Sequence, residues 1–184
     1  MPAVTSDPNS AEPLVSSPLV TPATRNALRD RLGQKPDAPS VFTPQEFALL
    51  GLLSVCLVPH DPATLPLAAQ IDARLSQGTT DGWRYDQLPP DAEAYRQLLA
   101  SLPVDFQSTD DGGRHAALTQ AQEDHPKIFE ELLAELTEGF YSNPLNQLAI
   151  GYVGFADAHG WTETRLDQLD PHEREALRLA GKSL

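Results

Sequence analysis

Residues 42–59 have the sequence FTPQEFALLGLLSVCLVP, which contains the longest apolar run of the chain. Thr43 is suited to cap a helix, Pro44 fits the first helical position, and Glu46 stands three residues after the cap. This combination is a capping box with a proline start, which is typical of a helix N-terminus. Apolar side chains then cover nearly all faces until Pro59 ends the helix. The stretch therefore predicts a buried central helix.

Helical signals recur on both sides of this segment, while no alternating strand pattern longer than four residues occurs. Further helices are predicted over residues 22–32, 66–78, 91–102, 116–124 and 126–142. A glycine-containing loop is predicted over residues 109–113. The predicted fold is all-α, an irregular bundle of about five or six helices with long loops.

The clearest amphipathic pattern of the chain lies in residues 126–142. Its apolar stripe consists of Phe129, Leu132, Leu133, Leu136 and Phe140. The other faces carry Glu130, Glu131, Glu135 and Glu138. We expect these glutamates to form a solvated face, and an acidic docking surface is the alternative.

Composition divides the chain into three parts. Residues 1–40 form a Pro/Ser-rich tail with a short helix near 22–32, and residues 1–20, which hold four prolines and no apolar periodicity, are expected to be disordered. Without that periodicity they should bury nothing, so the fold should not need them. Residues 41–165 form the helical domain, and residues 166–184 form a C-terminal extension with a short helix.

Charge and hydropathy exclude several classes of function. The chain has 13 basic and 26 acidic residues, which argues against nucleic-acid binding because phosphate needs a basic surface. The longest apolar run, residues 47–58, is shorter than the ~20 residues of a membrane span, so direct membrane insertion is not expected. Residues 1–20 contain no Lys or Arg and hence no export signal. A cytoplasmic location is expected, or a periplasmic one if the chain is exported with a partner.

The sequence offers little for catalysis. Cys56, the only cysteine, lies in the apolar helix, where burial should raise the pKa of its thiol. The chain has no nucleophile-elbow, dinucleotide-binding or Walker motif, so no catalytic residue, cofactor site or metal site is assigned. The histidines are scattered, and loop positions explain them most simply. A small metal-binding protein or enzyme that uses His60, Asp157 and His159 is the alternative.

Aromatic residues alternate with glycines after the helix that ends near residue 142. Two interpretations stay open: the glycines allow tight turns while the aromatic rings close the edge of the bundle, or the rings form a hot spot for a partner. The candidate partner-binding residues are Phe140, Tyr141, Gly151, Tyr152, Gly154, Phe155 and Trp161.

Three stretches of this sequence resemble the gluconate 2-dehydrogenase subunit 3 family. The first is Phe42-Thr-Pro-Gln-Glu-Phe47 with its apolar helix ending Leu57-Val-Pro59, and the second is Ile71-Asp-Ala-Arg-Leu75 with Gly78-Thr-Thr-Asp-Gly-Trp83. The third and most specific is Phe140-Tyr-Ser-Asn-Pro144 followed by Ile150-Gly-Tyr-Val-Gly154. Together they cover roughly residues 41–165.

The resemblance implies a non-catalytic accessory subunit of an oxidoreductase complex. Its partner would be a large flavoprotein dehydrogenase of the glucose–methanol–choline type that acts on sugars or sugar acids. FAD would be held by that partner, a cytochrome subunit often completes the complex, and this chain would carry no cofactor. Small subunits of the family assist maturation and export, commonly with a twin-arginine signal, which residues 1–20 do not contain.

Overall fold

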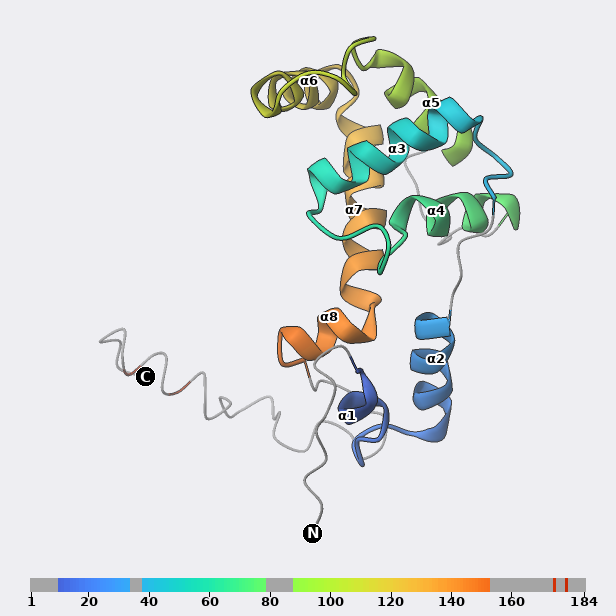
Figure 1. Ribbon diagram of the computed structural model, residues 1–184, viewed down its shortest axis with the longest axis vertical. Helices are drawn as coiled ribbons and strands as arrows, with labels where there is room; N and C mark the ends of the chain where they lie inside the picture. The colour runs from blue at the N-terminus through green and yellow to red at the C-terminus, as the bar shows by residue number, and fades with distance from the viewer. Residues whose placement is uncertain (1–9, 34–37, 79–87, 153–173, 175–177, 179–184) are drawn as a thin grey trace.

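The computed structural model describes residues 10–33, 38–78 and 88–152, together with residues 174 and 178 (Figure 1). The helices in these ranges are α1 (Glu12–Val15), α2 (Pro22–Gly33), α3 (Pro44–Leu57), α4 (Leu67–Ser76), α5 (Asp91–Ser101), α6 (Asp111–Asp124), α7 (Pro126–Ser142) and α8 (Pro144–Ala149). No strand occurs in the described ranges, so the predicted all-α fold is confirmed.

The predicted capping box at the start of α3 is present. The backbone N–H of Glu46 donates to Oγ1 of Thr43 over 3.3 Å, and the N–H of Thr43 donates to Oε2 of Glu46 over 2.8 Å. The helix ends before Val58, whose extended backbone leads into Pro59. Helix α3 packs against α4, α5 and α7, but only Leu50, Leu53 and Ser54 of its residues are buried. The prediction of a buried central helix is therefore wrong, because α7, which contacts α3, α4, α5, α6 and α8, takes the central place among the described helices.

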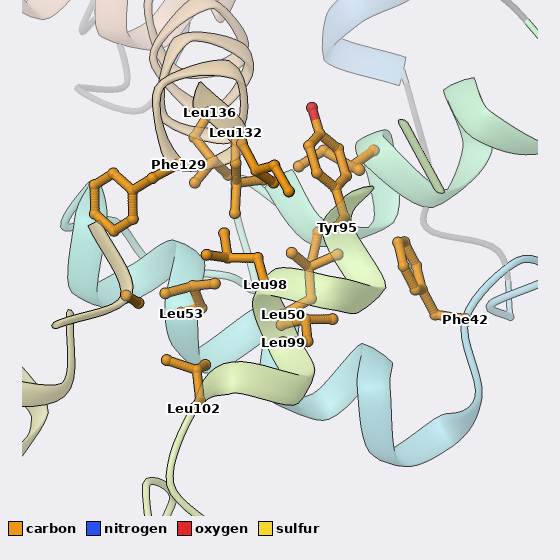
Figure 2. Close-up of a cluster of buried hydrophobic side chains, with 14 of the residues drawn as sticks. Phe42, Leu50, Leu53, Tyr95, Leu98, Leu99, Leu102, Phe129, Leu132 and Leu136 are labelled. Carbon is orange, nitrogen blue, oxygen red and sulfur yellow. The ribbon is translucent and has the colours of Figure 1, made fainter. Parts of the chain in front are cut away.

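The main core lies between α3, α4, α5 and α7 (Figure 2). Side chains from all four helices meet there, including Leu50 of α3, Leu98 of α5 and Leu132 of α7, each at most 1% exposed. The predicted stripe of α7 faces this core: Phe129, Leu132 and Leu136 are buried, and Leu133 and Phe140 are partly buried against it. Burial of the α7 stripe therefore holds the bundle together.

Two helix starts, those of α6 and α8, differ from the sequence prediction. Helix α6 begins at Asp111 rather than near residue 116, because the Asp110 side chain accepts a 2.8 Å hydrogen bond from the N–H of Gly113 and caps the helix. The loop predicted over 109–113 is therefore wrong for residues 111–113, which belong to α6, and holds for residues 109 and 110. Helix α5 begins at Asp91, as predicted, and Pro90 before it makes no side-chain capping bond. Helix α8 was not predicted, and Asn143 caps it by accepting from the N–H groups of Leu145 and Asn146.

Residues 10–20, predicted to be disordered, are ordered. Helix α1 and the turn after it bury Leu14, Val15 and Val20 against Leu28 of α2. The Arg25 guanidinium reinforces this arrangement by donating to backbone carbonyls of residues 15, 17 and 20, the shortest bond being 2.7 Å. The prediction of disorder rested on the proline content. It is wrong for these residues because the apolar side chains between the prolines pack against α2. Residues 1–9 lie outside the described residues.

The prediction of a short helix in the C-terminal extension lies largely outside the described residues. Of the extension 166–184, only residues 174 and 178 are described, and both are helical. Among the helices of the described ranges, none has the length and apolar character that crossing a membrane requires.

Candidate functional site

The predicted partner-binding residues begin in the last turn of α7. The rings of Phe140 and Tyr141 meet edge to face, with centroids 5.2 Å apart and planes at 85°. Phe140 packs against the main core, whereas Tyr141 is 50% exposed. The two neighbouring aromatic residues therefore have different roles: Phe140 closes the bundle, and Tyr141 projects from it.

The chain turns sharply after α8. Gly151 adopts a φ of 70°, a conformation that glycine tolerates without strain, which agrees with the interpretation that the glycines allow tight turns. The N–H of Tyr152 then donates to the carbonyl of Gln147 over 2.8 Å, which fixes the backbone beyond the turn. Tyr152 is 42% exposed, and Ile150, absent from the predicted set, is 58% exposed.

Three exposed apolar residues lie near the ends of α7 and α8 in the sequence. Tyr141, Ile150 and Tyr152 make up half of the large hydrophobic residues that are exposed in the described ranges. We call these three residues the α7–α8 surface. The other predicted members, Gly154, Phe155 and Trp161, lie outside the described residues.

A polar network that sequence reasoning missed joins α4, α5 and α7. The Arg74 guanidinium donates to both carboxylate oxygens of Glu135, over 2.5 and 2.8 Å, and to Asp91 over 3.0 Å. Tyr95 donates its hydroxyl hydrogen to the same Glu135 carboxylate over 2.6 Å. Glu135 was expected on a solvated face, and for this residue the prediction is wrong.

The charges of this network explain the acid–base properties of its members. The hydrogen bonds from Arg74 to Glu135 raise the pKa of the guanidinium further above its usual value. Burial, together with the negative charge of Glu135, raises the pKa of Tyr95. Both groups therefore stay protonated at neutral pH, so neither can act as a base. A shallow pocket of about 100 Å³ lies beside these residues.

Asp72 of α4 forms a second polar link, to the segment before α3. Its Oδ2 accepts from the N–H and hydroxyl of Ser40, over 2.7 and 3.1 Å, and its Oδ1 accepts from the N–H groups of Val41 and Phe42, both over 3.0 Å. Desolvation opposes ionisation of this carboxyl, which is 3% exposed, but these donors prevail and lower its pKa. Asp72 and Arg74, both in the second resembling stretch, thus hold helices together.

The residues of the metal alternative are only partly described. Nδ1 of His60 lies 2.5 Å from the carbonyl of Val58, while Asp157 and His159 lie outside the described residues. Across the described ranges, no three or more His, Cys, Asp or Glu side chains are grouped so that they could hold a metal ion. Cys56 is partly buried in α3, and burial raises the pKa of its thiol, as predicted.

Comparison of the chain with protein-family models, curated proteins and solved structures finds no match. Its function is therefore inferred from its own residues: two polar links that hold the helices, and an exposed apolar surface at the end of α7 and α8.

Proposed function

We propose that this protein is a non-catalytic accessory subunit that binds and stabilises or matures a large FAD-dependent dehydrogenase of the glucose–methanol–choline type. The observation that carries the proposal is the α7–α8 surface, where two tyrosines and an isoleucine are exposed. It lies in the stretch whose resemblance to the gluconate 2-dehydrogenase subunit 3 family is most specific. Tyrosine is enriched among the residues that dominate binding energy at protein interfaces.

The backbone around this surface is well held, which favours binding. Asn143 caps α8 directly after α7 ends, and the turn at Gly151 is closed by the bond from Tyr152 to Gln147. A side chain on an ordered backbone loses less conformational entropy when a partner binds. The exposed residues are therefore suited to act as anchors for a partner.

The charged side chains outside the α7–α8 surface support a structural role for this protein. Arg74, Glu135 and Asp72 have their hydrogen-bonding groups directed to other parts of the same chain. Such groups stabilise the arrangement of α3, α4, α5 and α7 and present no free nucleophile or base. We infer that the FAD chemistry belongs to the partner subunit.

Affinity capture of the full chain from its native host tests the proposal. The captured protein is identified by mass spectrometry, its flavin by absorbance, and its activity by sugar-dependent reduction of a dye. We expect the wild-type chain to retain a flavoprotein dehydrogenase, and Tyr141→Ala combined with Tyr152→Ala to weaken binding. The loss should reach at least about 2 kcal/mol, or roughly thirtyfold in affinity.

Val104→Ser is the matched control. Val104 is fully exposed in the connection between α5 and α6, at the other end of α7 from α8 (Figure 1). This variant should capture the dehydrogenase as the wild type does. Capture of no flavoprotein by the wild type, or equal capture by the double tyrosine variant, would contradict the proposal.

A further inference from the structure

The described chain has two apolar clusters that share no residue. The main core contains 18 buried residues, all from position 42 onward. The second, which we call the N-terminal cluster, consists of Ala11, Leu14, Val15, Val20 and Leu28. Within the described ranges, the apolar residue that joins it from the rest of the chain is Leu145 of α8. The N-terminal cluster is thus a small unit placed on the end of the bundle.

A polar contact crosses this junction. Arg31 of α2 donates to the carbonyl of Ser142, the last residue of α7, over 3.4 Å in an exposed position. This carbonyl belongs to the C-terminal turn of a helix, where a positive charge is favourable. The bonds of Arg25, in contrast, stay inside residues 10–33. They hold the shape of the N-terminal segment and do not attach it to the bundle.

The contacts of α2 with α7 and α8 indicate which side chains a helix needs in order to pack against α8. Helix α2 presents Leu28 to the cluster that Leu145 joins and, one turn later, Arg31 to the carbonyl end of α7. The exposed ring of Tyr141 comes directly before Ser142, and Ile150 follows α8. If α2 leaves, Leu145 becomes exposed. This residue lies in the sequence between Tyr141 and Ile150 of the α7–α8 surface.

We propose that the outer side of α8, with the end of α7, is a docking surface for an amphipathic helix that carries a leucine and, three residues later, an arginine. In the free chain α2 occupies this surface, and it leaves when the partner binds. That the partner is the flavoprotein dehydrogenase rests on the proposed function. The N-terminal segment thereby covers part of the interface until the complex forms.

Hydrogen exchange of the full chain, followed by mass spectrometry, tests whether α2 detaches alone. Helix opening that exposes five buried residues needs less free energy than opening of the main core. We expect amides of α2 to exchange at least about tenfold faster than those in the middle of α7. Equal protection of the two helices overturns the proposal, because α2 would then open only when the whole protein unfolds.

The variant Leu28→Asp tests whether α2 is what covers α8. Leu28 is 1% exposed, so a charge there should separate the segment. We expect at least about tenfold faster exchange in α2 and α8, with α5 and α7 changed by less than about twofold. The control Ala27→Asp adds the same charge at an exposed neighbour and should change neither. Unaltered α8 exchange, or equal loss of protection in α7, overturns the proposal.

Addition of the captured dehydrogenase separates this proposal from the proposed function. We expect binding to slow exchange in α8 and to accelerate it in α2, and Leu28→Asp to bind at least as tightly as the wild type. Slower exchange in α2 on binding would show that α2 is part of the interface. This result overturns the proposal that the partner displaces α2, while the proposed function stands. If no flavoprotein binds, the proposed function fails, and the exchange of the free chain still decides whether α2 is a detachable occupant.

Discussion

The hydroxyl group of Tyr95 in α5 donates a 2.6 Å hydrogen bond to the Glu135 carboxylate in α7. The tyrosine is 3% exposed, so its hydroxyl has little access to water as an alternative partner. Arg74 of α4 binds the same carboxylate and supplies the positive charge that a half-buried glutamate needs. This bond therefore completes a link between three helices that are distant in the sequence.

Removal of the Tyr95 hydroxyl should destabilise the fold. We expect Tyr95→Phe to lower the free energy of unfolding by about 1.5–3 kcal/mol, the range for hydrogen bonds to charged groups. Urea unfolding followed by circular dichroism measures the change. Tyr141→Phe is the control, because that exposed tyrosine has no place in the network, and it should unfold as the wild type does. Equal stability of both variants would contradict the assigned role.

Replacement of Asp72 should destabilise the protein in a pH-dependent manner. Asp72→Asn keeps the shape but substitutes an amide donor for one acceptor oxygen that faces backbone N–H groups. We expect a loss of about 2–4 kcal/mol at pH 7, because buried N–H groups lose their acceptor.

The pH dependence follows from the lowered pKa of Asp72. Its pKa in the folded chain lies below the ordinary value of 3.8. The stabilisation is therefore complete above that value and is lost as the pH falls through the folded pKa. Unfolding curves of wild type and Asp72→Asn should converge below about pH 4. A constant difference between them down to pH 2 would show that ionisation of Asp72 is irrelevant.

Two helical glycines should respond in opposite ways to alanine. A Cβ at Gly139 of α7 would lie 2.8 Å from Cδ2 of Leu67, a side chain that is 2% exposed and cannot easily move. Gly51 of α3 has no atom within 4 Å of that position. We expect Gly51→Ala to stabilise by about 0.5–1 kcal/mol through helix propensity. Gly139→Ala should destabilise by about 1–2 kcal/mol through overpacking between α4 and α7. Thermal unfolding of both variants decides whether the helices approach this closely.

The thiol of Cys56 should react slowly. Burial raises its pKa, so the thiolate fraction at neutral pH is small, and access to the sulfur in α3 is restricted. We expect the reaction with a disulfide reagent at pH 7.5 to be at least about tenfold slower than that of glutathione. Urea should abolish the difference. Rapid modification of the folded chain would instead indicate an accessible thiol.

Local sequence signals determined which features could be predicted. The capping box of Thr43 and Glu46 lies within four residues and the apolar stripe of α7 within seventeen, so the sequence predicts both. Asn143-Pro144 ends α7 and also begins α8, which Asn143 caps. The sequence prediction included the end of α7 but not the start of α8. Gly112 and Gly113 are typical of a loop, but Asp110 before them caps a helix that includes both glycines.

The remaining features depend on contacts between distant residues. Glu135 is 61 residues from Arg74, and its sequence neighbours give no sign that it faces the pocket beside α4. Leu14 and Val15 are buried in a cluster with Leu28 of α2, a contact that the proline-rich composition of residues 1–20 does not indicate. For the α7–α8 surface, the sequence indicated Tyr141 and Tyr152 but not the exposure of Ile150.

Helix α4 carries Asp72 and Arg74 two residues apart, which has a consequence for the kinetics of folding. The Asp72 link to Phe42 spans 30 residues and the Arg74 link to Glu135 spans 61. A doubling of loop length costs only about 0.6 kcal/mol of closure entropy, so chain length barely decides which link forms first. Both links require α4 to be formed, and α4 is therefore expected to be structured in the transition state. Ala73→Gly, which weakens this helix by about 1 kcal/mol, should slow folding about fivefold and leave the unfolding rate almost unchanged.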